Sequence, residues 1–299
     1  MSRAGNRPAV EVIVVNFNSG DALARCVRSV LAQKLPVNIT VLDNASSDRS
    51  IVLLKEHFGS LKNLAILQSD KNMGFAKAVN EAARSLDPAG EYLLILNPDC
   101  EILQGSLEAL TGALDRDPQA GLAGPMVVDH EGRPLRATLR RFPGPGNAFF
   151  TFSGLWRLGR WIPAFGGVEK TGRLPVQATP AEAVSGACML LRHSGFLDVG
   201  GMDGDYGLHC EDLDLMYRLR QQGFYCLFVP ESRVYHAQGI SSRSRPFWVH
   251  WQKHRGMQRF FQKFQAGHTF FLLRWLVIAG IWLRFAATLP LVWIRHWAR

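Results

Sequence analysis

Polar side chains follow three stretches of the chain that the sequence predicts to be strands. They are Asn16, Phe17 and Asn18 after the first stretch, Asp43 and Asn44 after the second, and Asn97-Pro98-Asp99 after a later one. One polar residue after a strand is usually turn chemistry, because its side chain bonds nearby backbone amides. Three such groups at the carboxyl edge of one parallel sheet, where ligands bind in folds of this kind, instead favour a polar ligand site.

Asn97 and Asp99 place an amide oxygen and a carboxylate two residues apart at a strand end. This spacing suits one hard cation that keeps open positions for a diphosphate, although the same three residues also form common turns. Asp43 could accept a hydrogen bond from a base or a ribose. The chain contains no G-x-G-x-x-G and no G-x-x-x-x-G-K-[ST], so oxidoreductases with a dinucleotide fold and P-loop NTPases lose their main support.

Two carboxylates and two histidines lie further along the chain. Glu211 and Asp212 begin a predicted helix, where ionised carboxylates are stabilised. They could cap the helix, or Asp212 could act as general base toward an acceptor hydroxyl. His209 and His236 could each be a packed histidine or a ligand. Asp214 is expected to pair with Arg218 on the helix surface, as residues four apart do.

These residues require a sheet to position them. The chain alternates apolar, β-branched runs with helical stripes, a pattern typical of repeated βαβ units and a largely parallel sheet with helices on both faces. The predicted strands are Val10–Val15, Asn38–Leu42, Leu64–Leu67, Tyr92–Leu96, Ala187–Leu191 and Tyr225–Val229. The predicted helices are Asp21–Gln33 with Asp21 as its cap, one from Ser50, Phe75–Leu86 and Glu211–Gln222. Residues 141–180 predict a loop-rich insertion, a candidate acceptor-binding flap.

The charge of the chain is unevenly distributed. The 299 residues carry a net +9, but residues 1–240 sum to −1 and residues 241–299 to +10. The same tail holds six of the eight tryptophans. The neutral body argues against a nucleic-acid partner. Five widely spaced cysteines and the lack of a secretory signal favour reduced thiols on the cytoplasmic side.

The tail contains two apolar stretches, Trp275–Leu283 and Phe285–Ile294, separated by Arg284. Neither stretch reaches the length of about 20 residues that a spanning helix needs, and Pro290 is expected to kink or end the helix. A basic, aromatic helix lying in the plane of an anionic membrane surface fits this composition best. A tilted or re-entrant insertion and a contact with another subunit stay open.

The order of seven motifs resembles a family 2 glycosyltransferase of the GT-A fold, and within that family the bacterial rhamnosyltransferase-type enzymes. The motifs run from residue 9 to about 240: VEVIVVNFNSG, ITVLDNASSD, KNMGFAKAVNEA, YLLILNPDCEI, VSGACMLLR, GLHCEDLDLMYRLRQQGF and VYHAQG. The resemblance implies a Rossmann-like αβα catalytic domain over residues 1–240 and a helical membrane-associating tail over 241–299. It also implies inverting transfer of a sugar from a nucleotide diphosphate to a hydroxyl, with Mg²⁺ or Mn²⁺.

The resemblance also assigns roles to residues, position by position. The nucleotide-sugar contacts it implies are Asn16, Phe17, Asn18, Asp43, Asn72, Gly74, Asn80 and Asn97. Asp99 and His236 resemble the metal ligands; Asn97 stands where the family usually has the first aspartate of its D-x-D motif. Asp212 resembles the catalytic base, with Glu211 beside it.

We therefore expect a peripheral enzyme on the cytoplasmic face of the cell membrane that takes a nucleotide sugar and a lipid-linked or oligosaccharide acceptor. Rhamnose from dTDP-rhamnose is the preferred donor, by the resemblance; galactofuranose, glucose and N-acetylglucosamine stay open. One alternative is a sugar-phosphate nucleotidyltransferase, although the first turn lacks the glycine-rich, basic loop typical of that class. The other is a membrane-binding module without enzymatic activity.

Overall fold

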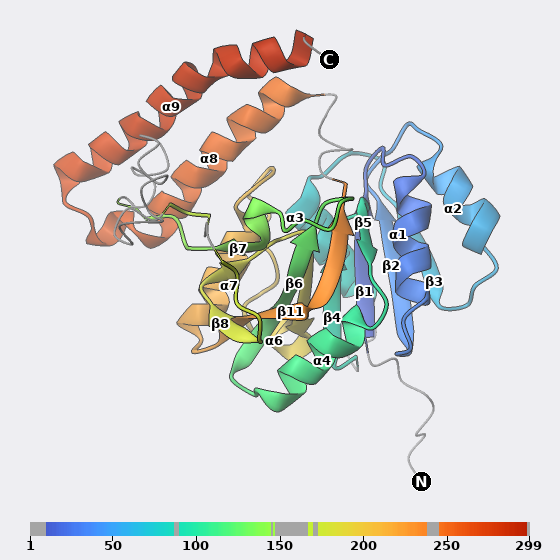
Figure 1. The fold of residues 1–299 in the computed structure, drawn as a ribbon. Helices are drawn as coiled ribbons and strands as arrows, with labels where there is room; N and C mark the ends of the chain where they lie inside the picture. The colour runs from blue at the N-terminus through green and yellow to red at the C-terminus, as the bar shows by residue number, and fades with distance from the viewer. Residues whose placement is uncertain are drawn as a thin grey trace.

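The computed structural model describes residues 10–86, 90–144, 146, 167–169, 173–237 and 245–297. Its body is a mixed sheet with helices on both faces (Figure 1). The strands of this sheet are β1 (Val10–Asn16), β2 (Val37–Asp43), β3 (Leu64–Gln68), β4 (Tyr92–Leu96), β5 (Cys100–Ile102), β6 (Ala120–Val128), β8 (Thr179–Ala181), β10 (Cys188–Arg192) and β11 (Tyr225–His236). The helices are α1 (Ala22–Leu31), α2 (Ser50–Phe58), α3 (Phe75–Arg84), α4 (Ser106–Arg116), α6 (His193–Asp198), α7 (Glu211–Gln221), α8 (Pro246–Phe264) and α9 (Phe271–Trp297).

The strand order explains why the polar strand ends meet. It is β3-β2-β1-β4-β10-β6-β11-β5, with β8 on β11. Strands β1 to β4 are parallel, and β6 and β11 run parallel to each other. Strand β10 is antiparallel to both β4 and β6, so β6 and β11 run in the same direction as β1 and β4. The carboxyl ends of β1, β4 and β11 therefore lie at one edge, as the predicted α/β architecture requires.

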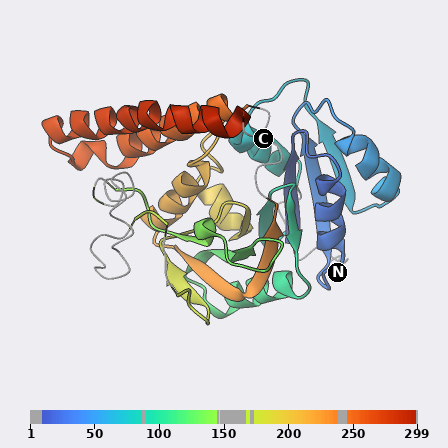
Figure 2. The same ribbon diagram turned by 45° about the horizontal axis from the view of Figure 1, so that its top comes forward.

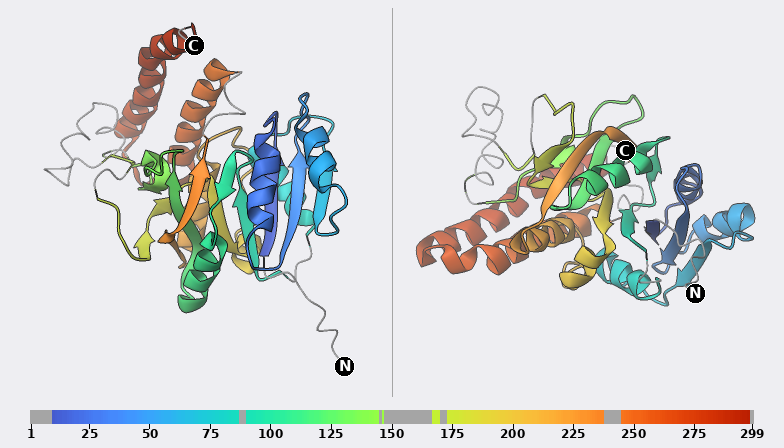
Figure 3. Two further views of the ribbon diagram at one scale, coloured as in Figure 1. Left: turned by 45° about the vertical axis from the view of Figure 1, so that its right-hand side comes forward. Right: turned by 90° about the horizontal axis from the view of Figure 1, so that it is seen from below.

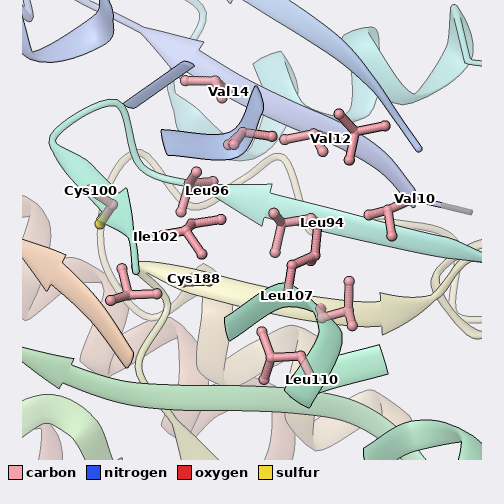
Figure 4. Close-up of a cluster of buried hydrophobic side chains, with 14 of the residues drawn as sticks. Val10, Val12, Val14, Leu94, Leu96, Cys100, Ile102, Leu107, Leu110 and Cys188 are labelled. Atoms are coloured by element: carbon pink, nitrogen blue, oxygen red, sulfur yellow. The ribbon is translucent and has the colours of Figure 1, made fainter. Parts of the chain in front are cut away.

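Two apolar layers hold the sheet between its helices. Alternate residues of β1 point to opposite faces, as the period of a strand demands. Val10, Val12 and Val14 pack with residues of α1, α2 and α4 on one face, whereas Ile13 and Val15 pack with α3, α6 and α7 on the other. Figure 4 shows part of the first layer, where β1, β4 and α4 interlock. A strand buried on both faces reads as a near-continuous apolar run, which is how β1 appears in the sequence.

Several details differ from the sequence expectations. Asp21 precedes α1 but makes no capping hydrogen bond; its carboxylate pairs with Arg25 instead, because its own backbone is helical. Strand β5, helix α4 and strand β6 were not predicted. Most of the expected insertion, residues 147–166 and 170–172, lies outside the described residues, so its role as an acceptor flap stays a prediction. The short pair β7 (Leu139–Arg140) and β9 (Ala183–Val184) brackets it.

The tail forms two antiparallel helices that project together from one side of the body (Figures 1 and 2). They touch through Trp282, whose indole N–H donates to Gln258 Oε1 at 2.7 Å, and through the stacked rings of His250 and Phe285. The expectation that Pro290 ends or kinks the helix is wrong in one respect, because α9 continues through Pro290 to Trp297. Pro290 lacks the backbone N–H that would donate one hydrogen bond, but the other backbone hydrogen bonds of this long helix still form.

Helix α8 is anchored to the body, whereas α9 is largely exposed; Figure 3 shows both rising from the same side. Phe260 of α8 is buried in the second core layer. Arg259 and Lys263 form ion pairs with Asp203 at 2.9 and 2.7 Å, and Lys263 also reaches Asp214 at 2.6 Å. The boundary between body and tail that the sequence predicts at residue 240 stays a prediction. Helix α8, which lies beyond that residue, packs against the body.

The expected pair of Asp214 and Arg218 is present, at 2.5 Å. Its expected position on the helix surface is wrong, because the Asp214 side chain is fully buried. Lys263 of α8 covers it, and a buried carboxylate needs such a second cation to offset its lost hydration.

Candidate active site

A cavity of about 1020 Å³ opens at the edge where β1, β4 and β11 end. Of the predicted site residues, it brings together Phe17, Asn72, Gly74, Asn97, Asp99, Glu211, Asp212 and His236. The size reaches the upper end of the range for small-molecule sites, so the cavity has room for two ligands side by side. The remaining predicted residues, Asn16, Asn18, Asp43 and Asn80, do not line it.

Asp99 and His236 form the candidate metal centre. The turn after β4 carries Asp99, and His236 is the last residue of β11; the imidazole Nε2 lies 3.2 Å from Asp99 Oδ1. Cys100 Sγ also lies within 4.8 Å of these ligand atoms. Burial raises the pKa of the Cys100 thiol well above its usual range, and the thiol donates to the Ala187 carbonyl at 3.5 Å. Mg²⁺ and Mn²⁺ also prefer oxygen ligands to soft sulfur. One oxygen and one nitrogen donor with open positions fit Mg²⁺ or Mn²⁺.

Glu211 and Asp212 occupy the first turn of α7 and line the same cavity. The chain enters this helix through His209 and Cys210, both in the left-handed region with φ of 67° and 70°. The Asp212 carboxylate accepts from the backbone N–H of Leu213 at 2.8 Å and forms an ion pair with Arg140. Both side chains of the pair are mostly buried, which fixes the position of Asp212.

Arg140 is a site residue that sequence reasoning missed. It lies in β7 and also donates to the Val184 carbonyl of β9, with nitrogen–oxygen distances of 2.7 and 3.1 Å. Its sequence neighbourhood shows a second arginine and a Pro/Gly cluster, and neither pointed to Asp212. The ion pair between Arg140 and Asp212 depends on the tertiary contact of β7 with α7, which a local sequence pattern does not predict.

Glu211 differs from its neighbour in protonation. Its side chain is buried, and Oε2 has no hydrogen-bond partner among the described residues. Burial and the adjacent charge of Asp212 raise the pKa of Glu211 well above its usual range. The two adjacent carboxylates therefore differ in environment: burial and the charge of Asp212 favour the protonated form of Glu211, while Arg140 pairs with Asp212.

Asn16, Asp43 and Asn18 hold the loop between β2 and α2 in place. Asn16 Nδ2 donates to Asp43 Oδ1 at 2.8 Å and to Ser50 Oγ at 2.8 Å, and Asn16 is fully buried. Asn18 Oδ1 accepts from the backbone N–H of Ser47 at 2.8 Å. Their direct contact with a nucleoside stays a prediction.

Asn44 and Asn72 both line the cavity. Asn44 accepts from the Met73 N–H at 2.9 Å and donates to Asn72 Oδ1 at 3.1 Å. Gly74, with φ of 85°, then begins α3 where other residues would be strained. Asn44 was noted as a strand-end residue but was not assigned to the site.

Asn80 has a structural position. Its side-chain amide donates to the Met202 carbonyl at 2.7 Å and accepts from the Met202 N–H at 2.8 Å. Both polar groups of the amide are therefore committed to the turn that follows α6. Its predicted role in binding nucleotide is untested.

Five basic residues line the cavity, and no sequence pattern indicates that they face it. They are Arg136, Arg140, Arg245, Lys253 and Arg284. Arg245 and Lys253 belong to the stretch that was expected to meet lipid, so their basic character was noted but not their direction. Only the packing of α8 and α9 against the body turns them inward.

Comparison with known proteins gives consistent results. Residues 11–194 match the family model for glycosyl transferase family 2, and residues 168–298 match that for glycosyl transferase family group 2. The N-acetylglucosaminyl-diphospho-decaprenol L-rhamnosyltransferase of Mycobacterium tuberculosis is 29% identical over 285 residues, covering 91% of this chain and 90% of that protein. Rhamnosyltransferase WbbL of Escherichia coli is 26% identical over 245 residues, covering 79% of this chain and 86% of that protein.

Solved structures share the fold at low identity. GalNAc-T7 with UDP, GalNAc and Mn²⁺ superposes with a TM-score of 0.61 at 18% identity over 86% of this chain, which spans about half (48%) of that chain. The mannosyltransferase PcManGT of Pyrobaculum calidifontis, in complex with GDP-Man and Mn²⁺, gives 0.58 at 17% identity, covering 95% of this chain and 76% of that one.

The predicted GT-A fold is confirmed by these structures, and the predicted enzyme class by the family match. The nucleotidyltransferase and the module without enzymatic activity therefore lose their support. Because the first family model covers more than half of the chain, the protein belongs to glycosyl transferase family 2 and is a glycosyltransferase.

Proposed function

We propose that this glycosyltransferase transfers rhamnose, with inversion, from dTDP-rhamnose to a hydroxyl of a lipid-linked acceptor during cell-surface glycan synthesis. One observation carries the proposal: the Asp99–His236 pair and Asp212 line one cavity. The chain is also similar, over 91% of its length, to an L-rhamnosyltransferase whose name includes a diphospho-decaprenol acceptor, and this similarity supports the proposed donor sugar and acceptor class.

The nucleotide diphosphate is placed at the end of the cavity where β1 and β4 terminate. Phe17 and Asn44 line this end, and Asn72 and Gly74 close it on the side of α3. Asp99 and His236 would hold a divalent cation, Mg²⁺ or Mn²⁺, and solved relatives of this fold that contain Mn²⁺ support that choice. When bound, the cation would neutralise charge on the leaving diphosphate.

Asp212 is the proposed general base. Its carboxylate takes the proton of the acceptor hydroxyl, whose oxygen then attacks the anomeric carbon from the face opposite the diphosphate, so the configuration inverts. Arg140 forms an ion pair with the carboxylate, and the Leu213 N–H donates a hydrogen bond to it. Both contacts orient the Asp212 carboxylate before the acceptor binds. The raised pKa of Glu211 favours its protonated form, which limits the negative charge in the same turn.

The tail is proposed to attach the enzyme to an anionic membrane surface on the cytoplasmic side. Phe271–Ile294 is, within the described residues, a helix long and apolar enough to span a membrane, by length and composition alone. This corrects the expectation of two short stretches, because the helix runs through Arg284 and Pro290. Attachment in the plane is favoured, since one side of α9 packs on α8 while Trp275, Leu276 and Leu283 are exposed.

The proposal is tested by assaying nucleoside diphosphate release with several nucleotide sugars, each with Mg²⁺, Mn²⁺ or EDTA, and a lipid diphosphate acceptor. The expected result is transfer from dTDP-rhamnose that requires a divalent cation and yields a product of inverted anomeric configuration. Asp212→Asn should abolish transfer, because the amide cannot accept the proton, while donor affinity changes little. Turnover retained in that variant would overturn the assignment of the base.

A further inference from the structure

The cavity has a second end, formed by the tail helices. Lys253 of α8 and Arg284 of α9 line it, together with the apolar side chains of Trp248 and Met257. Lys253 and Arg284 also line a smaller adjoining cavity of about 180 Å³, shared with His254. Two cations from different helices thus point into the same space.

Within the part of the chain that the structure describes, neither Lys253 nor Arg284 forms an ion pair, unlike three other cations of this region. Arg140, Arg259 and Lys263 all form ion pairs with carboxylates. Among the described residues, Lys253 and Arg284 form none; the contact of Arg284 is with Met257 Sδ at 4.0 Å. Glu169 is the acid whose charge reaches both, at longer range. Positive charge left uncompensated in a cleft attracts an anionic ligand.

The electrostatics of Lys253 agree with that reading. Its side chain is open to solvent within the cleft, but the surrounding protein and the charge of Arg284 lower its pKa. An anion bound between the two cations would relieve both effects. Arginine and lysine are the side chains that proteins use most for phosphate oxygens.

His254 independently indicates that a polar group enters the smaller cavity. The residue is 1% exposed, and its Nδ1 donates to the His250 carbonyl at 2.8 Å. Its Nε2 is buried without a hydrogen-bond partner among the described residues, although it belongs to the lining of this cavity. A buried polar nitrogen left unpaired is costly, so water or a ligand group is expected there.

The surroundings of the two cations suit the groups of a lipid-linked acceptor. Lys253, Arg284 and Asp212 line the same cavity. Trp248 and Trp251 of α8 and several apolar side chains of α9 are exposed. An acceptor with its anionic linker at Lys253 and Arg284 would have a sugar hydroxyl within the cavity that Asp212 lines and a lipid chain free to meet the exposed apolar side chains.

We infer that Lys253 and Arg284 form a subsite for the phosphate groups of an acceptor whose sugar is joined to lipid through a diphosphate. The inference rests on the proposed function and deepens it, because it names the group by which the acceptor is recognised. Lys253 and Arg284 bind the phosphate oxygens, His254 Nε2 takes a water that hydrates them, and the exposed apolar side of α9 meets the membrane from which the lipid extends.

The test uses two soluble acceptors with the same short alkyl chain on N-acetylglucosamine, one linked through a diphosphate and one as a plain glycoside. Lys253→Gln and Arg284→Gln should each raise KM for the diphosphate acceptor about ten-fold, the effect of losing one hydrogen bond to a charged group. KM for the glycoside and for the donor should not change. Lys253→Arg and Arg284→Lys, which keep the charge, should retain most of the affinity.

Arg255→Gln is the matched control, because Arg255 lies on the same helix, stacks on Trp251 and lines neither cavity. It should behave as wild type. A rise in the donor KM of the Lys253 and Arg284 variants would place the donor diphosphate there instead. Loss of binding to phosphatidylglycerol vesicles with unchanged acceptor kinetics would indicate a lipid headgroup site. Either result overturns the inference.

Binding of the diphosphate acceptor, measured by titration calorimetry, separates this inference from the proposed function. If the wild-type protein transfers sugar to neither acceptor, the proposed function fails, and the calorimetric comparison of wild type with Lys253→Gln still tests the subsite. Equal affinity of the two proteins for the diphosphate acceptor would refute the subsite even where transfer is observed.

Discussion

Replacing Gly186 by alanine perturbs the proposed base without touching its chemistry. Gly186 lies in the turn between β9 and β10, against the side chain of Asp212. A Cβ built there would lie 2.8 Å from Asp212 Cβ and 2.9 Å from its Cγ, and closer still to Oδ2. Contacts of 3.4 Å or more are ordinary, so the aspartate must move away.

The size of the effect follows from that geometry. Arg140 holds the carboxylate, so the added methyl group is expected to displace Oδ2 by on the order of 1 Å, and a shift of this size costs about 100-fold in rate. A 100-fold loss corresponds to about 2.7 kcal/mol in the activation free energy. Overpacking should also lower the free energy of unfolding, by about 1–3 kcal/mol.

The assay measures kcat from nucleoside diphosphate release at saturating donor and acceptor, and donor affinity separately. We expect kcat to fall about 100-fold while donor affinity stays near wild type, because the three atoms nearest the added Cβ all belong to Asp212 and none to the predicted metal ligands. Gly112→Ala is the control: Gly112 lies in α4, and its Cβ would meet only Arg116 Nη1 at 3.5 Å. That variant should keep full activity and gain about 0.5–1 kcal/mol in stability. A folded Gly186→Ala protein with wild-type kcat would refute the reasoning.

Three further predictions concern carboxylates. Asp99→Ala should weaken nucleotide binding in Mn²⁺ but not in EDTA; equal affinity in both conditions for wild type and variant would contradict the metal site. Glu211→Gln should keep most activity, because it mimics the protonated acid. The pKa of Glu211 is raised by folding, so wild-type stability falls as pH rises through that pKa, and unfolding curves should show the variant gaining stability over wild type at alkaline pH. Although burial opposes it, hydrogen bonds from Lys263 and Arg259 lower the pKa of Asp203 to about 2. Asp203 therefore stabilises the fold above about pH 4, and this contribution is lost as pH falls toward 2. Asp203→Asn should be less stable than wild type at pH 7, with the difference shrinking at acid pH; a constant difference would refute the linkage.

The sequence predicted the parts of the fold that local patterns encode. The β-branched run of β1, interrupted only by Glu11, and the helical stripes of α1 and α3 are visible because each depends on residues near one another in the chain. Strand β10 shows what such patterns leave open: its apolar run predicts a strand but not that it lies antiparallel between β4 and β6. Strand order depends on long-range packing.

The same division applies to the site. The residue types after β1 and β4 and at the start of α7 predicted a polar ligand site, because parallel strands bring their carboxyl ends to one edge. The prediction of a nucleotide-sugar enzyme came from the resemblance of seven ordered motifs to family 2 glycosyltransferases. The ion pair of Arg140 with Asp212, between residues 72 positions apart, could not be predicted, since spacing alone does not determine such a contact. The composition of the tail predicted a basic, aromatic surface element. Only the packing of α8 and α9 against the body decided that Lys253 and Arg284 face the catalytic cavity, because the direction of a side chain is fixed by the contacts of its helix.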